Sequence, residues 1–354
     1  MKLDLQGFSW SRVGWAVVTL AIGTLGGVVF DFIGMPAAYL AGSMVMVALA
    51  AVVRVPVELP LPLRSLAFVV LGAILGATMD RRTLESLPEW PVSIIGLLVG
   101  LAILMTVVPR YLQRFHRIDQ QTARMCAIPG ALGYIVALSL ELDVDSRRVA
   151  ILHTLRLAVL LTFISAVVAL AYDMQDVAIA SDKAILDWWT ALGLVAASFA
   201  VVPVAQKLRF PAPTFIAPMF LVGGLSMSGV IAGMLPTDLL WPSLVISGSV
   251  VGARFAGTSL RYLWDSTKAG LGGIALAIGL MGLLAWPVAW WTQMPFIQVW
   301  LAYAPGGFDA MPVLAFSLGL DPAFVAGHQL IRFLAISVTI PFLFRRPNAK
   351  PDAR

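Results

Sequence analysis

Ten apolar runs set what this chain can fold into. They lie near residues 13–30, 36–53, 62–79, 90–108, 149–172, 185–205, 211–232, 240–258, 268–291 and 323–344. A helix needs about 20 apolar residues to cross the hydrocarbon of a bilayer, and most of these runs are about that long. Only 12% of the residues are charged, against about 25% in soluble domains. The sequence therefore predicts an all-α polytopic membrane protein.

Two further apolar stretches, near 122–142 and 297–319, are interrupted by residues that break helices. Pro129 and Gly130 interrupt the first, and Pro305, Gly306 and Gly307 interrupt the second. Proline removes a backbone donor and glycine frees the backbone angles, so both helices should open there.

The two interruptions correspond to each other. PGALGYIVALSLELDVDSRRVAILHTLR (129–156) aligns without a gap with PGGFDAMPVLAFSLGLDPAFVAGHQLIR (305–332), and GAILGATMDRRTL (72–84) aligns with GSVVGARFAGTSL (248–260) at the same offset of 176 residues. Pro36 pairs with Pro213 after a one-residue slip. This pattern predicts an internal duplication, with a first membrane repeat at 1–176 and a second at 177–354.

Charges in the loops predict how the two repeats are oriented. If each interrupted stretch re-enters on the side it left, each repeat crosses five times and the second repeat is inverted. Lys207, Arg209, Arg261 and Lys268 then join the other basic loops in the cytoplasm, whereas twelve full crossings would place them outside. The preference of Lys and Arg for the cytoplasm favours ten crossings, two inverted repeats and cytoplasmic termini.

The opened turns around Pro129–Gly130 and Pro305–Gly307 are the first candidates for a substrate site. Irregular backbone at membrane depth is tolerated only where protein buries it or where it lines a cavity, and free N–H groups at a helix end attract anions. Two kinks packed against their neighbours, without a ligand, are the alternative.

Arg156 and Arg332 lie inside apolar helices, where arginines are costly and usually mark a site. We expect them to be charge partners of the substrate, with snorkelling to the interface as the alternative. His153 and His328 share a helix face with these arginines and are further candidates, although each could equally be a structural histidine.

Three aspartates receive different interpretations. Asp145 and Asp321 precede the arginine-bearing helices, and Pro322 follows Asp321, which is typical of a helix N-cap. Asp309 lies inside the second opened stretch, where the first repeat has Gly133. It could pair with Arg332, carry a proton or bind a cation, so we interpret it as a coupling carboxylate.

Metal and cofactor sites are not expected. The single cysteine, Cys126, excludes a multi-thiolate site, and the three histidines lack metal-ligand spacing. The basic residues are scattered over short loops, which argues against direct nucleic-acid binding. The expected partners are the lipid bilayer and a small-molecule substrate, with a homo-oligomer left open.

Several motifs resemble the bacterial AbrB-type integral membrane family, which is known for an AbrB duplication. They are PAAYLAG (36–42), GAILGA (72–77), PGAL (129–132), PGGFDAMP (305–312) and the D-x-x-x-V-A-x-x-x-x-x-R pattern of both halves. The resemblance implies an inner-membrane protein with two copies of one module. Members are often labelled ammonia monooxygenase or regulator, but the absence of clustered ligands disfavours an oxygenase here.

The sequence thus favours a non-enzymatic secondary transporter or exporter of a small anionic metabolite. A membrane sensor or scaffold that affects gene expression indirectly is the alternative.

Overall fold

The computed structural model describes residues 10–79, 81–130, 135, 138–139, 144–171, 184–208, 210, 212–258, 260–307 and 310–344. In these ranges the chain is helical and has no strand, and seven helices are long and apolar enough to cross a membrane. The prediction of an all-α polytopic membrane protein is therefore confirmed.

All ten predicted crossing segments contain a helix. They are α1 (Trp10–Phe32), α2 (Ala38–Val52), α3 (Leu61–Thr78), α5 (Trp90–His116), α8 (Ser146–Ala171), α9 (Trp188–Lys207), α10 (Pro213–Met227), α11 (Leu240–Gly252), α12 (Leu260–Thr292) and α15 (Pro322–Leu343). The short elements α4 (Arg81–Ser86), η2 (Leu87–Glu89), η3 (Thr237–Leu239) and η4 (Ala253–Phe255) connect them.

Three of these helices are shorter than the sequence suggested. α2 and α10 have 15 residues each and α11 has 13, which gives lengths of about 20–22 Å against about 30 Å of hydrocarbon. Most residues of α2 and α11 are buried, so neighbouring protein covers these two helices and their length need not match the lipid. In α10, six of the 15 residues are buried.

The interrupted stretches contain still shorter helices. α6 (Gln120–Ala127) precedes the first break, and α13 (Phe296–Tyr303) and α14 (Ala310–Ser317) flank the second. Eight residues span about 12 Å, less than half of the hydrocarbon. None of these helices crosses a membrane alone.

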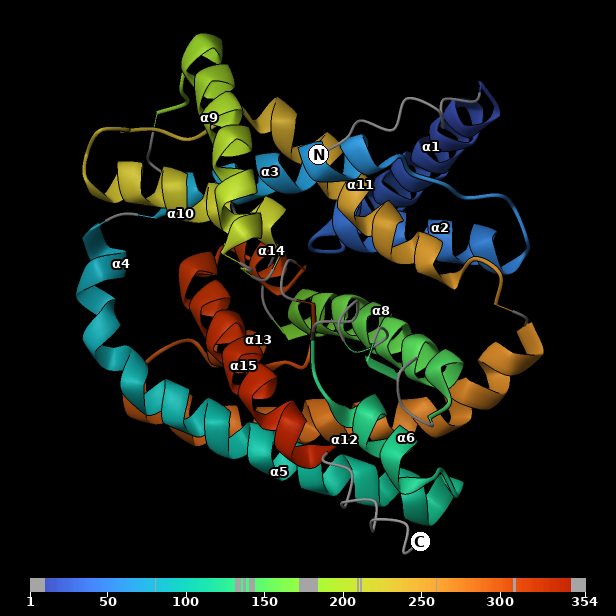
Figure 1. Ribbon diagram of the computed structural model, residues 1–354. Helices are drawn as coiled ribbons and strands as arrows, with labels where there is room; N and C mark the ends of the chain where they lie inside the picture. Colours follow the sequence, from blue (N-terminus) through green and yellow to red (C-terminus); the bar gives the residue numbers. More distant parts are fainter. Residues whose placement is uncertain are drawn as a thin grey trace, which may run out of the picture.

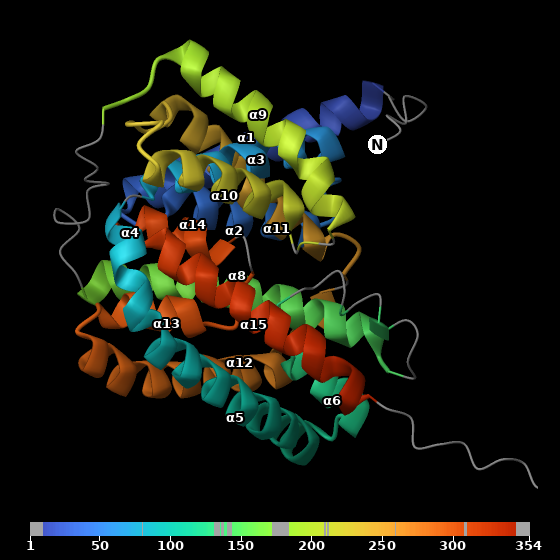
Figure 2. The ribbon, with the colours of Figure 1, turned by 60° about the vertical axis from the view of Figure 1, so that its left-hand side comes forward.

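The helices form two bundles, and each bundle draws on both halves of the sequence (Figures 1 and 2). The first contains α1, α2 and α3 together with α9, α10 and α11, and α3 packs on α10 as α2 packs on α11. The second contains α5, α6, α8, α12, α13 and α15. α14 lies between them, against α3 and α8.

Helix boundaries agree with the sequence alignment. α6 and α13 begin and end 176 residues apart, as do the starts of α8 and α15. The alignment of α2 with α10 differs from the predicted one. The residue before each helix has a left-handed conformation, and these residues are Ala37 (φ 54°) and Ala212 (φ 40°). The structure thus pairs Ala37 with Ala212, an offset one residue shorter than 176, whereas the predicted match of Pro36 with Pro213 is one residue longer.

Glycines on α3 and α11 allow close approach inside the first bundle. A methyl group at Gly76 would lie 2.6 Å from the Met219 carbonyl oxygen of α10, and one at Gly252 would lie 2.5 Å from the Met44 carbonyl oxygen of α2. Small residues at such crossings let helix backbones touch. These glycines serve packing.

We expect Gly252→Ala to destabilise the protein by about 1–3 kcal/mol, because the methyl group would collide with the backbone of α2. The measurement is the melting temperature in detergent. The matched control is Gly193→Ala on α9, where no atom lies within 4 Å and where alanine favours the helix. Equal melting temperatures for the two variants would contradict the packing role.

Candidate binding site at two re-entrant turns

Both interrupted stretches return to the side where they begin. The Asp145 backbone N–H donates to the Thr122 hydroxyl at 3.1 Å, which joins the start of α6 to the start of α8. The Asp321 backbone N–H donates to Gln298 Oε1 at 3.2 Å, which joins the start of α13 to the start of α15. The two ends of each interrupted stretch therefore lie side by side, and we call these stretches the re-entrant turns.

Asp145 and Asp321 are helix caps. The Asp321 carboxylate accepts from the N–H groups of Ala323 and Phe324 at 2.8 and 3.2 Å. Asp145 accepts from the Arg148 N–H at 2.9 Å and pairs with its side chain at 3.6 Å. These bonds satisfy N–H groups that a helix leaves open at its start. The N-cap interpretation is the one that the structure supports.

Both turns open immediately before a proline. The C-cap residues of α6 and α13 are Ile128 (φ −61°, ψ 122°) and Ala304 (φ −52°, ψ 133°), which directly precede Pro129 and Pro305. A following proline disfavours the helical region and pushes the preceding residue to extended backbone. The carbonyl groups at these two helix ends therefore need donors from elsewhere.

In the first turn the donors come from α8. Arg156 Nη1 and Nη2 both donate to the Ile128 carbonyl oxygen at 3.3 Å. His153 Nε2 lies 3.0 Å from the same oxygen, and its Nδ1 lies 2.9 Å from the Val149 carbonyl oxygen. Both predicted residues thus support the turn.

In the second turn the donors come from α15. Arg332 Nη1 donates to the Ala304 carbonyl oxygen, and Nη2 donates to that of Gly306 at 2.9 Å. Gln329 Nε2 donates to the carbonyl oxygens of Leu301, Ala302 and Ala304 at 3.2–3.4 Å. We refer to these side-chain contacts of Arg156, His153, Arg332 and Gln329 as the carbonyl brace.

Only one of the two predicted histidines, His153, contacts a turn. His328 Nδ1 bonds to the Phe324 carbonyl oxygen at 2.8 Å, and its ring packs against Trp90, Phe324 and Tyr303. Gln329, which sequence reasoning missed, takes the role of His153. The 176-residue offset pairs His153 with Gln329 and could have revealed it.

The two turns lie close together. A methyl group at Gly130 would be 3.1 Å from Arg332 Nη2, so the second-half arginine reaches the first-half turn. The side chains of Arg156 and Arg332 are both buried, with exposed fractions of 7% and 2%. Within the described residues, the ion pair found joins Arg148 to Asp145, and no carboxylate pairs with either arginine.

The second turn also has polar atoms without a partner. His328 Nε2, Gln329 Oε1 and Arg332 Nε are buried and make no hydrogen bond. Both ring nitrogens of His153, the residue equivalent to Gln329, contact carbonyl oxygens. Unpaired buried polar atoms are costly, so these three favour a bound group at the second turn.

Other predicted site residues belong to the turns themselves. Gly130 has φ +83°, which requires glycine or some strain. A methyl group at Gly306 would lie 2.6 Å from Met311 Cγ. Gly307 accepts from the Met311 N–H at 3.2 Å and so starts α14. Asp309 lies outside the described residues. The residues that are described include no cluster of three metal-ligating side chains.

Comparison with known proteins identifies the family. A sequence model described as "Transition state regulatory protein AbrB" matches residues 39–347. The chain belongs to the AbrB family. It is 25% identical to the protein YhjN of Bacillus subtilis (strain 168), over 92% of this chain and 91% of that protein. It is also 27% identical, over 95% of each chain, to a protein of Escherichia coli (strain K12). The name of that protein describes it as a regulator, AbrB.

Removing the α15 cap should weaken the fold near the second turn. Asp321→Ala loses the bonds to Ala323 and Phe324, so we expect about 1 kcal/mol of lost stability. Asp321→Asn keeps an acceptor oxygen and should lose far less. Melting temperatures of both variants in detergent test this, and equal losses would point to a role for the charge instead.

Proposed function

We propose that this AbrB-family protein is a secondary transporter or exporter of a small anionic metabolite. The observation that carries the proposal is the buried pair Arg156 and Arg332, which lies where the two re-entrant turns meet and has no carboxylate partner among the described residues. Buried charge is costly unless it is compensated. An anionic substrate would supply that compensation.

The carbonyl brace is compatible with a ligand. The brace uses both Nη atoms of Arg332 and leaves its Nε free, next to the unpaired Gln329 Oε1 on the same helix face. A donor and an acceptor would thus face the substrate together. Re-entrant backbone near the midplane is the arrangement in which secondary transporters hold substrates.

The re-entrant geometry also supports two inverted repeats. If each of the ten longer helices crosses once, the acidic side chains Asp31, Glu85, Glu89, Asp187, Asp238 and Asp321 lie on one side. Arg81 and Arg82, at the start of α4, lie on that same side. The other side then holds most of the basic residues near helix ends together with four acidic ones: Arg54, Arg64, Arg110, Arg114, Arg117, Arg124, Arg147, Arg148, Lys207, Arg254 and Lys268, with Glu58, Asp119, Asp145 and Asp265. By the positive-inside rule this basic side is the cytoplasmic face of a bacterial inner membrane, which also places both termini in the cytoplasm.

This topology can be tested by labelling introduced cysteines after the buried Cys126 is changed to Ala. A membrane-impermeant maleimide should label Asp238→Cys in intact cells, because that exposed residue lies on the acidic side. Arg114→Cys, also exposed, should react only after the cells are permeabilised. Labelling of both in intact cells would contradict the inverted arrangement.

The function is tested by ligand-induced stabilisation and flux. We expect one class of small anion to raise the melting temperature of the wild type and to be transported by proteoliposomes. Arg332→Gln should reduce affinity and flux at least tenfold, since one charge-assisted contact contributes about 1.5–3 kcal/mol. Asp309→Asn should lower flux while the protein still binds and folds. The control is Arg110→Gln, an exposed arginine at the end of α5.

The alternative function is a membrane sensor or scaffold with an indirect effect on gene expression. The name of the Escherichia coli relative favours a regulatory role. A scaffold would tolerate Asp309→Asn and would depend on its loops, so unchanged signalling in this variant together with no flux in the wild type would replace the transporter proposal. We propose no enzymatic activity in either case.

A further inference from the structure

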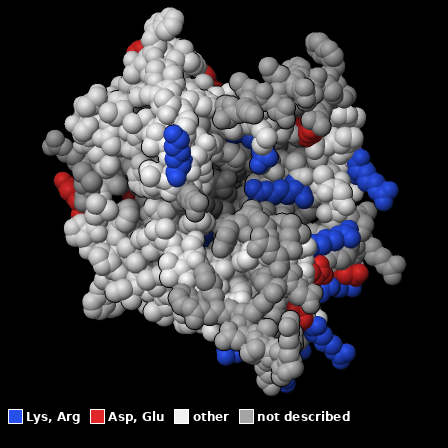
Figure 3. Space-filling model, viewed as in Figure 1, with Lys and Arg blue, Asp and Glu red and all other residues white. Residues whose placement is uncertain are grey.

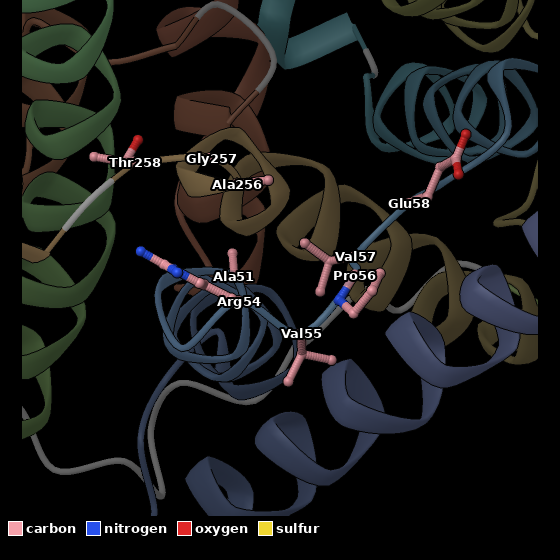
Figure 4. Close-up of a pocket in the computed structure, with 9 residues that line it drawn as sticks. All are labelled: Ala51, Arg54, Val55, Pro56, Val57, Glu58, Ala256, Gly257 and Thr258. Atoms are coloured by element: carbon pink, nitrogen blue, oxygen red, sulfur yellow. The ribbon is translucent and has the colours of Figure 1, made fainter.

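Two cavities adjoin at the turn between α11 and α12. The larger, about 460 Å³, lies between the end of α2, the segment 54–58 and residues 256–258 (Figure 4). The smaller, about 230 Å³, lies between the start of α8 and residues 254–258. Ala256, Gly257 and Thr258 line both cavities. We call the combined space the vestibule.

Three arginines from three different elements line the vestibule. Arg54 follows α2, Arg147 lies in the first turn of α8, and Arg254 lies in η4. All three side chains are exposed, and Glu58 is the acidic residue among the lining residues. In the same view as Figure 1, basic side chains gather around a hollow in this face of the molecule (Figure 3).

The placement of these arginines does not follow from local helix stability. Arg147 lies beside the positive end of the α8 dipole, where a basic residue is unfavourable. Arg54 has φ 68°, a left-handed conformation that is uncommon for residues other than glycine. Figure 4 shows its side chain extending from the end of α2 toward Thr258. The left-handed backbone of Arg54 is a local cost, which favours a role for this side chain in binding.

The vestibule is connected to the re-entrant turns through α8. The smaller cavity is lined by Ala150, Ile151 and Thr154 of this helix. Arg156 lies on the same helix, nine residues after Arg147, which corresponds to about 13 Å at 1.5 Å per residue. An anion bound at the vestibule would therefore lie about 13 Å along α8 from the buried Arg156.

We propose that the vestibule is a second, peripheral anion site that binds a compact anion with two or more negative charges, of the phosphate or polycarboxylate type. Three cations within one hollow attract such a group more strongly than a monovalent anion. The ligand could be a soluble anion or the headgroup of an anionic lipid, which share this chemistry. Only the role of the site as an entrance rests on the proposed transport function.

The test measures binding of inorganic pyrophosphate to the full-length protein in detergent by isothermal titration calorimetry. The double variant Arg54→Gln/Arg254→Gln should raise the Kd at least tenfold, while the matched variant Arg110→Gln/Arg114→Gln on α5 should leave it unchanged. Wild-type affinity should also fall steeply with added salt, since the site is exposed. Melting temperatures establish that all variants are folded.

A second arm identifies the source of the anion. Titrations are repeated in nanodiscs of phosphatidylcholine and of a phosphatidylcholine–phosphatidylglycerol mixture. Loss of pyrophosphate binding in the anionic nanodiscs assigns the site to lipid headgroups, and retained binding assigns it to soluble anions; both support the site. No binding to the wild type in either nanodisc or in detergent overturns the proposal, as does an equal loss in the α5 variant.

One further variant separates this proposal from the transport proposal. Arg332→Gln should bind pyrophosphate like the wild type, because Arg332 lies in the buried site. If Arg332→Gln abolishes binding and the vestibule variant does not, the anion occupies the re-entrant turns and the vestibule site is refuted. If Arg332→Gln keeps binding but also keeps full flux, the vestibule stands and the transport site is refuted.

Discussion

The structure depends on the carbonyl brace between α8 and α15 and the ends of two broken helices. Proline leaves the last carbonyl groups of α6 and α13 without intrahelical partners, and water is scarce at membrane depth. Arg156 and Arg332 supply donors from the next long helix of each half. Without them, two re-entrant turns with open carbonyl groups would be costly to bury. Two costly features, an intramembrane arginine and a broken helix, thus stabilise each other.

The same brace creates the asymmetry from which function is inferred. In the first half, His153 and Arg156 both contact the Ile128 carbonyl oxygen, and the second ring nitrogen of His153 contacts that of Val149. In the second half, Gln329 replaces the histidine, and an acceptor oxygen and the Arg332 Nε remain unpaired. Two halves built on one plan therefore differ at the place where a ligand would bind. In the first turn both ring nitrogens of His153 contact carbonyl oxygens. At the second turn, Gln329 Oε1 and Arg332 Nε have no hydrogen-bond partner in the described part of the chain.

The separation of charge across the molecule adds a second level of organisation. The vestibule gathers arginines from α2, α8 and η4, which are far apart in sequence. It lies on the side that holds the basic loops, and α8 leads from it toward Arg156. Arg147 near the surface and Arg156 in the interior thus lie along one helix, which is the arrangement that the proposed transport of an anion would use.

The sequence by itself determined the membrane class, the helix positions, the two breaks and the candidate residues at them. The length of an apolar run and the positions of proline and glycine are properties of short sequence segments, so they can be recognised without knowing the tertiary contacts. Only the tertiary structure decided that α2, α10 and α11 are short helices, that the side chains of Arg156 and Arg332 donate to the carbonyl groups at the two breaks, and that both halves interlock in two bundles. It also brought Arg54, Arg147 and Arg254 together around one turn. These features depend on which distant groups a side chain meets, and no periodicity along the chain encodes that directly.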